Sequence, residues 1–118
     1  MQVRASARHV RMSPRKVQLV VETIRGQRAA VALASLQYAP QAAARDVWKV
    51  LRSAVANAEN NYGLNPDDLV VITATADKGP TFPMRYRPKA RGVAGPITKR
   101  TTHITVVVDD EVGRQARP

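Results

Sequence analysis

The chain begins with alternating apolar and polar residues, a pattern that predicts a strand over residues 2–10. Val3, Ala5 and Ala7 fall on one face, and the opposite face is polar and basic. A helix is expected to start at Ser13-Pro14. Ser13 can cap a helix with its hydroxyl, and Pro14 fits the first turn, where its missing N–H costs nothing.

Three helices are predicted from apolar residues spaced by three and four. Gly26 is expected to end the first, and the third is expected to run from about Pro40 to about Asn61. The sequence NPDD at residues 65–68 is typical of a turn after it. The apolar stripes are Val17, Val20, Val21 and Ile24, then Ala29, Ala32, Leu33 and Leu36, then Ala43, Val47, Val50, Leu51, Ala54 and Ala58.

Two later segments, LVVITATA at 69–76 and HITVVV at 103–108, are rich in the β-branched residues of strands. The residues between them would form an unusually long loop for a compact domain. A chain of 118 residues is expected to form one domain. We therefore predict an α+β fold over residues 1–118, with a small antiparallel sheet packed on about three helices and a long protruding β-hairpin.

The segment between these strands is basic and regularly spaced. Arg85, Arg87, Lys89 and Arg91 recur at every second residue, which on a strand places all four on one face with Tyr86 opposite. Residues 77–102 are accordingly predicted to form an extended hairpin arm that turns near residues 89–93. At ~3.3 Å per residue the arm would reach roughly 45 Å beyond the body.

The charge of the chain indicates an anionic partner. Lys and Arg number 19 against 9 Asp and Glu, which gives a net charge of +10 and a pI of about 11.1. No apolar run approaches the roughly 20 residues of a membrane-spanning helix. A lone two-stranded ribbon is only marginally stable in water, so an external partner is needed to order the arm. Phosphates fit this role, because guanidinium groups bind them well. The other interpretation, a solvated basic loop, stays open at this point.

The cations fall into two groups, which favour an extended footprint on a folded nucleic acid. There is no helix-turn-helix spacing, zinc finger or aromatic RNP motif, so contact with shape and backbone is favoured over reading of bases. That favours structured RNA over a DNA operator. The first group, interrupted only by Glu22, is Arg4, Arg8, Arg11, Arg15, Lys16, Arg25 and Arg28; the arm adds Lys78, Arg85, Arg87, Lys99 and Arg100.

No catalytic pattern is present in the sequence. There is no Cys, and His9 and His103 have no local partners at catalytic or metal-binding spacing. Both are interpreted as structural or RNA-contacting. The acidic residues 109–111 are expected to end a strand in solvent. We therefore expect no enzyme activity, no cofactor and no metal site.

Three co-linear motifs resemble one known family. They are VRMSPRKVQLVVETIRG at 10–26, VLRSAVANAENNYGL at 50–64 and KGPTF…RPKARG…ITKRTTHITVVV at 78–108. Together they are similar to the bacterial large-subunit ribosomal protein numbered twenty-two, over nearly the whole chain. The resemblance implies a structural constituent of the large subunit that binds rRNA of several domains and supports assembly. It also implies that the long hairpin lines the exit tunnel of the nascent peptide.

The resemblance implies roles for particular residues and partners. The partners would be large-subunit rRNA, neighbouring ribosomal proteins and, at the tip, the nascent polypeptide; no membrane or homo-oligomer is implied. The location would be the cytoplasmic ribosome, with an organellar ribosome left open. Ser13, Thr101 and His103 join the RNA-binding cations, and the tunnel-lining tip would be Pro88, Lys89, Ala90, Arg91, Gly92, Val93 and Ala94.

The chain also departs from the family pattern. Val93 stands where many relatives have an Arg, and the segment at residues 82–85 holds one residue more than the commonest pattern. An alternative function, a free architectural nucleic-acid-binding protein outside the ribosome, is consistent with the same charge. A preference for a folded rRNA fragment over duplex DNA would separate the two.

Overall fold

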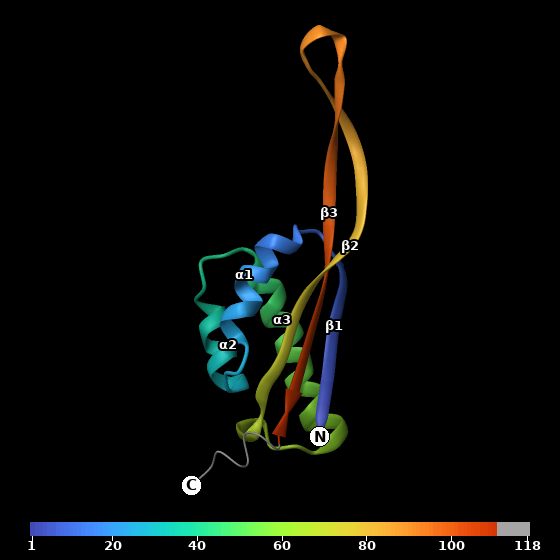
Figure 1. The fold of residues 1–118 in the computed structure, drawn as a ribbon. Coiled ribbons are helices and arrows are strands. Elements are labelled where there is room, and N and C mark those ends of the chain that lie inside the picture. The colour runs from blue at the N-terminus through green and yellow to red at the C-terminus, as the bar shows by residue number, and fades with distance from the viewer. Residues whose placement is uncertain (111–118) are drawn as a thin grey trace.

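The computed structural model describes residues 1–110, apart from the side chains of residues 83–85, and it has the predicted α+β fold (Figure 1). Single-turn 3-10 helices at Pro66–Asp68 and Ala90–Gly92 lie before and after the second strand. The main elements are β1 (Gln2–Val10), α1 (Pro14–Ile24), α2 (Ala29–Gln37), α3 (Ala43–Tyr62), β2 (Val70–Pro88) and β3 (Ala94–Asp109).

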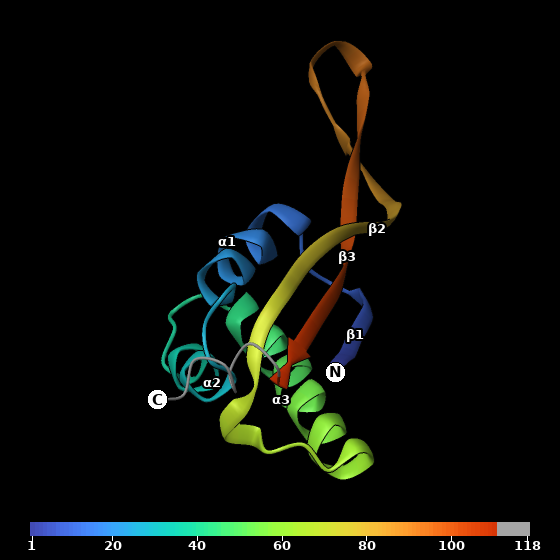
Figure 2. The ribbon, with the colours of Figure 1, turned by 60° about the horizontal axis from the view of Figure 1, so that its bottom comes forward.

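The three strands form one antiparallel sheet in the order β1-β3-β2. In the central strand β3, Ile104, Val106 and Val108 are fully buried and point to the same face as Val3 of β1. The helices cover this face, with α3 crossing behind the strands and α1 beside β2 (Figure 2). The other face of the sheet carries no helix.

The core is aliphatic, as the composition requires. All three predicted helix stripes face it, and only Leu33 is partly rather than fully buried. Four alanines of α3, namely Ala43, Ala44, Ala54 and Ala58, are nearly inaccessible. Small side chains at these positions let α3 lie close to its neighbours, which compensates for the scarcity of aromatic residues.

The predicted start of the first helix is confirmed, whereas its expected side-chain cap and the start of the third helix differ from the prediction. Ser13 is the N-cap of α1, but its side chain makes no capping hydrogen bond; its backbone carbonyl accepts from Lys16 and Val17 instead. α3 begins at Ala43 rather than near Pro40 because the preceding residues form a separate turn. The expected glycine endings are confirmed, since Gly26 and Gly63 have φ values of 78° and 63°.

The acidic end of β3 is not in solvent, contrary to the sequence-based expectation. Asp109 and Asp110 are 7% and 3% exposed, and their Oδ1 atoms lie 3.3 and 2.9 Å from the amino group of Met1. Pairing of Gln2 with Asp109 brings the start of β1 to the end of β3. The hydrogen bond that the Met1 amine donates to Asp110, followed by the one that it donates to Asp109, raises the pKa of this amine to about 10. Glu111 lies outside the described residues.

Extra residues occur in both strands that flank β3. β2 has one extra residue against β3 at three places, between residues 71 and 73, 78 and 81, and 83 and 85. The last of these agrees with the additional residue noticed in the sequence at 82–85. β1 has a similar irregularity between Ala7 and Val10, where His9 takes a φ of 59°. Bulges bend and twist the strand that carries them, and β2 accordingly curves around β3 (Figure 1).

The predicted hairpin arm is confirmed. β2 and β3 continue beyond the end of β1 as a two-stranded ribbon, and the molecule measures 69 × 25 × 17 Å. The backbone N–H of Lys89 donates to the carbonyl of Val93 at 2.6 Å and closes the tip. The prediction that four cations share one face of a strand is wrong beyond residue 87. β2 ends at Pro88, and both Lys89 and Arg91 belong to the turn that follows.

Candidate nucleic-acid interface

The arm has no core of its own. Among the described side chains from 82 to 99 none belongs to the hydrophobic core, and all are exposed except that of Ile97, which is half-buried; Gly95, which has no side chain, is buried. Phe82, Tyr86 and Val93 are 51%, 71% and 59% exposed. A ribbon built in this way gains little from folding alone. Its surface is therefore available to a partner along its whole length.

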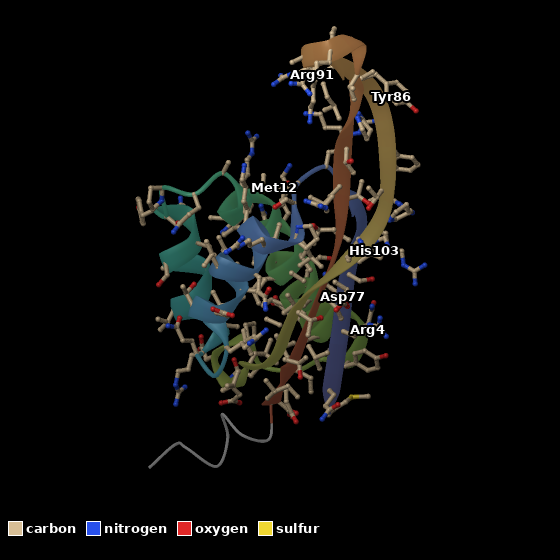
Figure 3. The ribbon with its side chains drawn as sticks, turned by 45° about the horizontal axis from the view of Figure 1, so that its top comes forward. Arg4, Met12, Asp77, Tyr86, Arg91 and His103 are labelled. Atoms are coloured by element: carbon tan, nitrogen blue, oxygen red, sulfur yellow. The ribbon has the colours of Figure 1, made fainter. Side chains whose placement is uncertain are left out.

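The tip combines a strained backbone with positive charge. Arg91 has φ 62° and ψ 31°, a left-handed conformation that non-glycine residues seldom adopt, and Figure 3 shows it at the far end of the arm, which also carries Tyr86. A Cβ placed on Gly95 would lie 2.6 Å from Cε of Lys89. The Lys89 side chain therefore crosses the ribbon at Gly95, while Arg91 is at the outermost turn.

The face of the sheet that no helix covers, which we call the open sheet face, is basic and rich in hydroxyl groups. Arg4 pairs in register with Val107, and Ser6 pairs with Thr105. Arg4 and Arg8 are exposed on this face, and Figure 3 shows Arg4 projecting from β1 below His103. This surface continues into the arm. It can donate hydrogen bonds to phosphate oxygens from both guanidinium and hydroxyl groups.

The start of α1 adds a third basic surface. Arg15 and Lys16 are exposed, while Ser13 is half-buried. The hydroxyl of Thr102 donates to the Met12 carbonyl at 2.6 Å, which ties this segment to β3 where the arm leaves the body. The basic helix start and the root of the arm are thus held together.

A groove of about 690 Å³ lies at this root, which we call the root groove. It brings together four residues predicted for RNA binding, which come from the segment after β1 and from β3. It also contains His9, which was interpreted as structural or RNA-contacting, and Phe82, which was not predicted for the site. Phe82 could have been found as the only phenylalanine of the chain, set within a basic segment. The residues lining the root groove are His9, Arg11, Phe82, Lys99, Arg100 and Thr101.

Two predicted contact residues are engaged inside the protein. Thr101 is 6% exposed, and its hydroxyl donates to the Pro80 carbonyl at 2.7 Å. His103 is half-buried, and its Nδ1 accepts from the backbone N–H of His9 at 3.2 Å. Both stabilise the root of the arm. The side chain of Arg85, also predicted, lies outside the described residues.

Two members of the first basic group likewise have structural partners. Nε of Arg25 donates to the Ala74 carbonyl at 2.8 Å, and Arg28 donates to the Asp67 carbonyl at 3.2 Å. These bonds tie the segment between α1 and α2 to β2 and its preceding turn. The predicted RNA-binding cations without such partners therefore lie on β1, the segment after it, the start of α1 and the arm.

The positive charge is not neutralised within the described part of the chain. The ion pairs there are those of the Met1 amine with Asp109 and Asp110, and no described Lys or Arg side chain lies within 4.0 Å of a carboxylate. Every described Lys and Arg is exposed. A polyanion would therefore meet a surface whose cations do not have to break ion pairs before binding.

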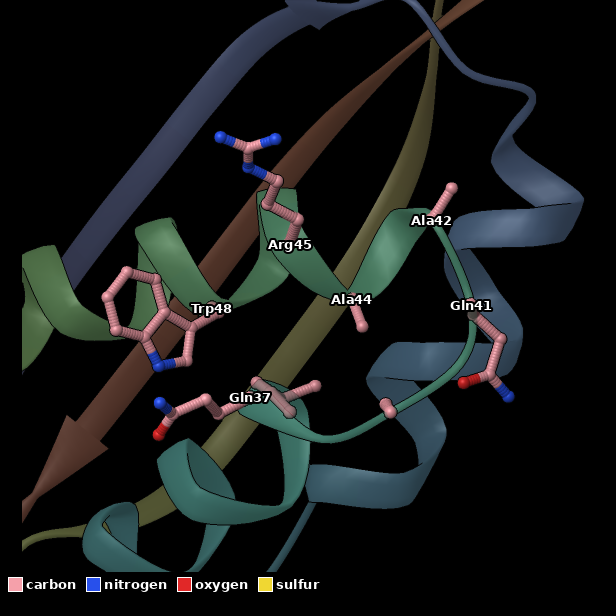
Figure 4. Close-up of a pocket in the computed structure, with 8 residues that line it drawn as sticks. Gln37, Gln41, Ala42, Ala44, Arg45 and Trp48 are labelled. Carbon is pink, nitrogen blue, oxygen red and sulfur yellow. The ribbon is translucent and has the colours of Figure 1, made fainter.

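A second hollow, of about 490 Å³, lies between α2 and α3 (Figure 4). Leu36, Arg45 and Trp48 contribute to it, and the guanidinium of Arg52 lies 5.2 Å from the centre of the Trp48 ring. It contains no predicted site residue.

Over residues 1–110 there is no cluster of three residues able to hold a metal, and no described helix is long and apolar enough to cross a membrane.

A compact α+β body with a coreless, strongly basic arm defines a structural nucleic-acid-binding protein. The family described as ribosomal protein L22p/L17e matches residues 5–109. The chain belongs to this family, and the resemblance noted in the sequence is confirmed. These are structural, rRNA-binding proteins of the large ribosomal subunit rather than enzymes, and they associate with rRNA and with other ribosomal proteins.

Proposed function

We propose that this chain joins several domains of large-subunit rRNA, supports assembly of the subunit and lines the nascent-peptide exit tunnel with its hairpin tip. The observation that carries the proposal is the arm. It extends from a stable body as a two-stranded ribbon, without a core and with exposed cations that have no carboxylate partner. Such a ribbon needs surrounding rRNA to be ordered.

The mechanism is electrostatic and architectural. Arg4 and Arg8 of the open sheet face and Arg15 and Lys16 of α1 lie on the body, whereas Arg87 lies on the arm. Cations at separate positions along a 69 Å molecule can neutralise phosphates of rRNA segments that would otherwise repel one another. The proposed contact set further includes Arg11, Ser13, Lys78, Arg85, Lys99 and Arg100, with Thr101 and His103 holding the root of the arm.

The proposed tunnel-facing segment is the turn from Pro88 to Ala94. It is the end of the arm farthest from the body, and Arg91 holds its charge at the outermost turn. Lys89 lies across the ribbon at Gly95 and supports the turn from within. A nascent polypeptide passing this tip would encounter the guanidinium of Arg91 and the exposed side chain of Val93.

Sedimentation of native lysate after a high-salt wash tests the proposal. The chain is expected to sediment with the large subunit, because an arm embedded in rRNA is held by its geometry as well as by charge. Recovery at the top of the gradient, while other large-subunit proteins stay bound, would contradict the proposal. The alternative, a free architectural nucleic-acid-binding protein, would then lead, and equal affinity for duplex DNA and a folded rRNA fragment would support it.

A further inference from the structure

The root groove has a composition that phosphate contact alone does not require. Three cations, Arg11, Lys99 and Arg100, share it with the aromatic rings of His9 and Phe82. The Phe82 side chain is 51% exposed and does not belong to the core. Exposure of a phenylalanine forgoes the stabilisation that burial would give, so the ring is available to an external partner.

The walls of the root groove are fixed by the fold. His9 lies in the β1 irregularity, its backbone N–H is bound to His103 Nδ1, and the two imidazole rings meet edge to face at 5.1 Å. The Thr102 hydroxyl holds the Met12 carbonyl, which fixes the segment that carries Arg11. A site already held in this way loses little conformational entropy when a ligand enters.

The size and chemistry of the groove suit a nucleotide. Its volume of about 690 Å³ is within the range of pockets for small organic ligands, and none of the described residues that line it is acidic. Bases stack on aromatic side chains while nearby cations bind the flanking phosphates. A base within a duplex is already covered by its neighbours, so an aromatic surface is useful chiefly to an unstacked base.

We infer that the root groove binds one unstacked rRNA nucleotide, with its base against Phe82 and His9 and its flanking phosphates at Arg11, Lys99 and Arg100. This inference rests on the proposed rRNA-binding function and deepens it. The open sheet face and the arm contact the RNA backbone, whereas the root groove recognises a single-stranded position. One bulged or flipped-out nucleotide would thereby fix the point at which the arm enters the rRNA.

The test uses intact large subunits that carry Phe82→Leu, isolated through an affinity tag on this chain. Leucine keeps an apolar side chain but removes the ring, so the immobilised nucleotide should become mobile. We expect the 2′-hydroxyl acylation of one or two single-stranded nucleotides to rise by about fivefold or more, as loss of a stacking contact predicts. The matched control is Tyr38→Leu, which removes an 83% exposed aromatic ring from the end of α2 and should leave these nucleotides unchanged.

A second measurement replaces Phe82 with a photoreactive benzophenone amino acid, which retains an aromatic ring. Cross-links are expected at the same one or two nucleotides. Identical acylation profiles for Phe82→Leu and wild type, or cross-links only to base-paired nucleotides or to protein, would overturn the inference. Failure of the ribosomal function itself would look different, because the unaltered chain would then be missing from large subunits.

Discussion

Gly79 lies at the root of the arm, where the close packing leaves no room for a larger side chain. A Cβ added there would lie 2.5 Å from Oγ1 of Thr101 and 3.1 Å from Cε1 of His103, both held by hydrogen bonds. We expect Gly79→Ala to lower the free energy of unfolding by about 1–3 kcal/mol, measured by urea denaturation.

Gly95→Ala is the matched control for this substitution. Its added Cβ would meet only the end of the flexible Lys89 side chain, which can move away. Neither glycine has a positive φ, so backbone conformation does not separate them. Equal loss of stability in the two variants would refute the claim that close packing at Gly79 matters.

The Met1 amine provides a pH-dependent contact for the chain that begins at this residue. Its pKa is raised from 8.0 to about 10 by the Asp110 and Asp109 carboxylates. A pKa raised by folding stabilises the folded state fully below the unfolded value, and this stabilisation is lost as pH rises through the folded value. The contribution should therefore be complete below pH 8 and disappear as pH passes about 10.

N-terminal acetylation isolates this contribution, because it removes the charge of the amine and leaves every side chain unchanged. The native form should need more urea to unfold than the acetylated form at neutral pH. The difference between the two midpoints should narrow from about pH 8 and be gone above about pH 10. A difference that stays constant over this range would mean that the amine pKa is not raised.

At the scale of elements, the body should be independent of the arm. The side chains that the structure describes between 82 and 99 contribute nothing to the core, and Thr81 pairs directly with Arg100. Replacing residues 82–99 by Asn-Gly gives a favoured two-residue hairpin loop. The free energy of unfolding should change by no more than about 1 kcal/mol, because none of the described side chains that are removed is buried.

The shortened chain should nevertheless be lost from large subunits during a high-salt wash, because it lacks the arm that is proposed to be embedded in rRNA. Retention at the wild-type level would show that the body alone anchors the protein. A large loss of stability in the urea experiment would instead show that the arm takes part in folding of the body.

The tip is expected to act on the nascent peptide rather than on assembly. Replacing Lys89 and Arg91 by Ala should leave incorporation into large subunits unchanged but alter peptide stalling or the response to macrolides. Arg91→Gly is an informative companion, because it removes the same charge while relieving the left-handed backbone. Wild-type stalling and macrolide response in all variants would contradict the assignment of the tip.

Local periodicity was enough to predict the helices and the hairpin, whereas contacts between distant residues were not predictable. The stripe from Val17 to Ile24 specifies a helix within one segment, and the two-residue spacing around Arg87 indicates a ribbon. Asp110 accepts a hydrogen bond from the Met1 amine, 109 residues away in the chain, so the burial of this carboxylate could not be predicted from neighbouring residues. The root groove was missed for the same reason, because its residues come from three separate segments.

At the scale of the whole molecule, the arrangement of charge should matter beyond its amount. Arg4 and Arg8 lie on the open sheet face, whereas Arg45 and Arg52 lie on α3. Replacing either pair by Gln removes two charges, so the net charge is the same in both variants. Only the first pair belongs to the proposed rRNA surface.

Binding of the two variants to a large-subunit rRNA transcript, measured over a range of salt concentrations, separates these effects. Each lost phosphate contact reduces the steepness of the plot of log affinity against log salt by about 0.7–0.9, so the Arg4 and Arg8 variant should lose about 1.5. The Arg45 and Arg52 variant should keep nearly the wild-type slope. Equal reductions would mean that rRNA responds to net charge alone, and the proposed surface would lose its support. Unequal reductions in the expected direction would place rRNA on the open sheet face, continuous with the root groove and the arm.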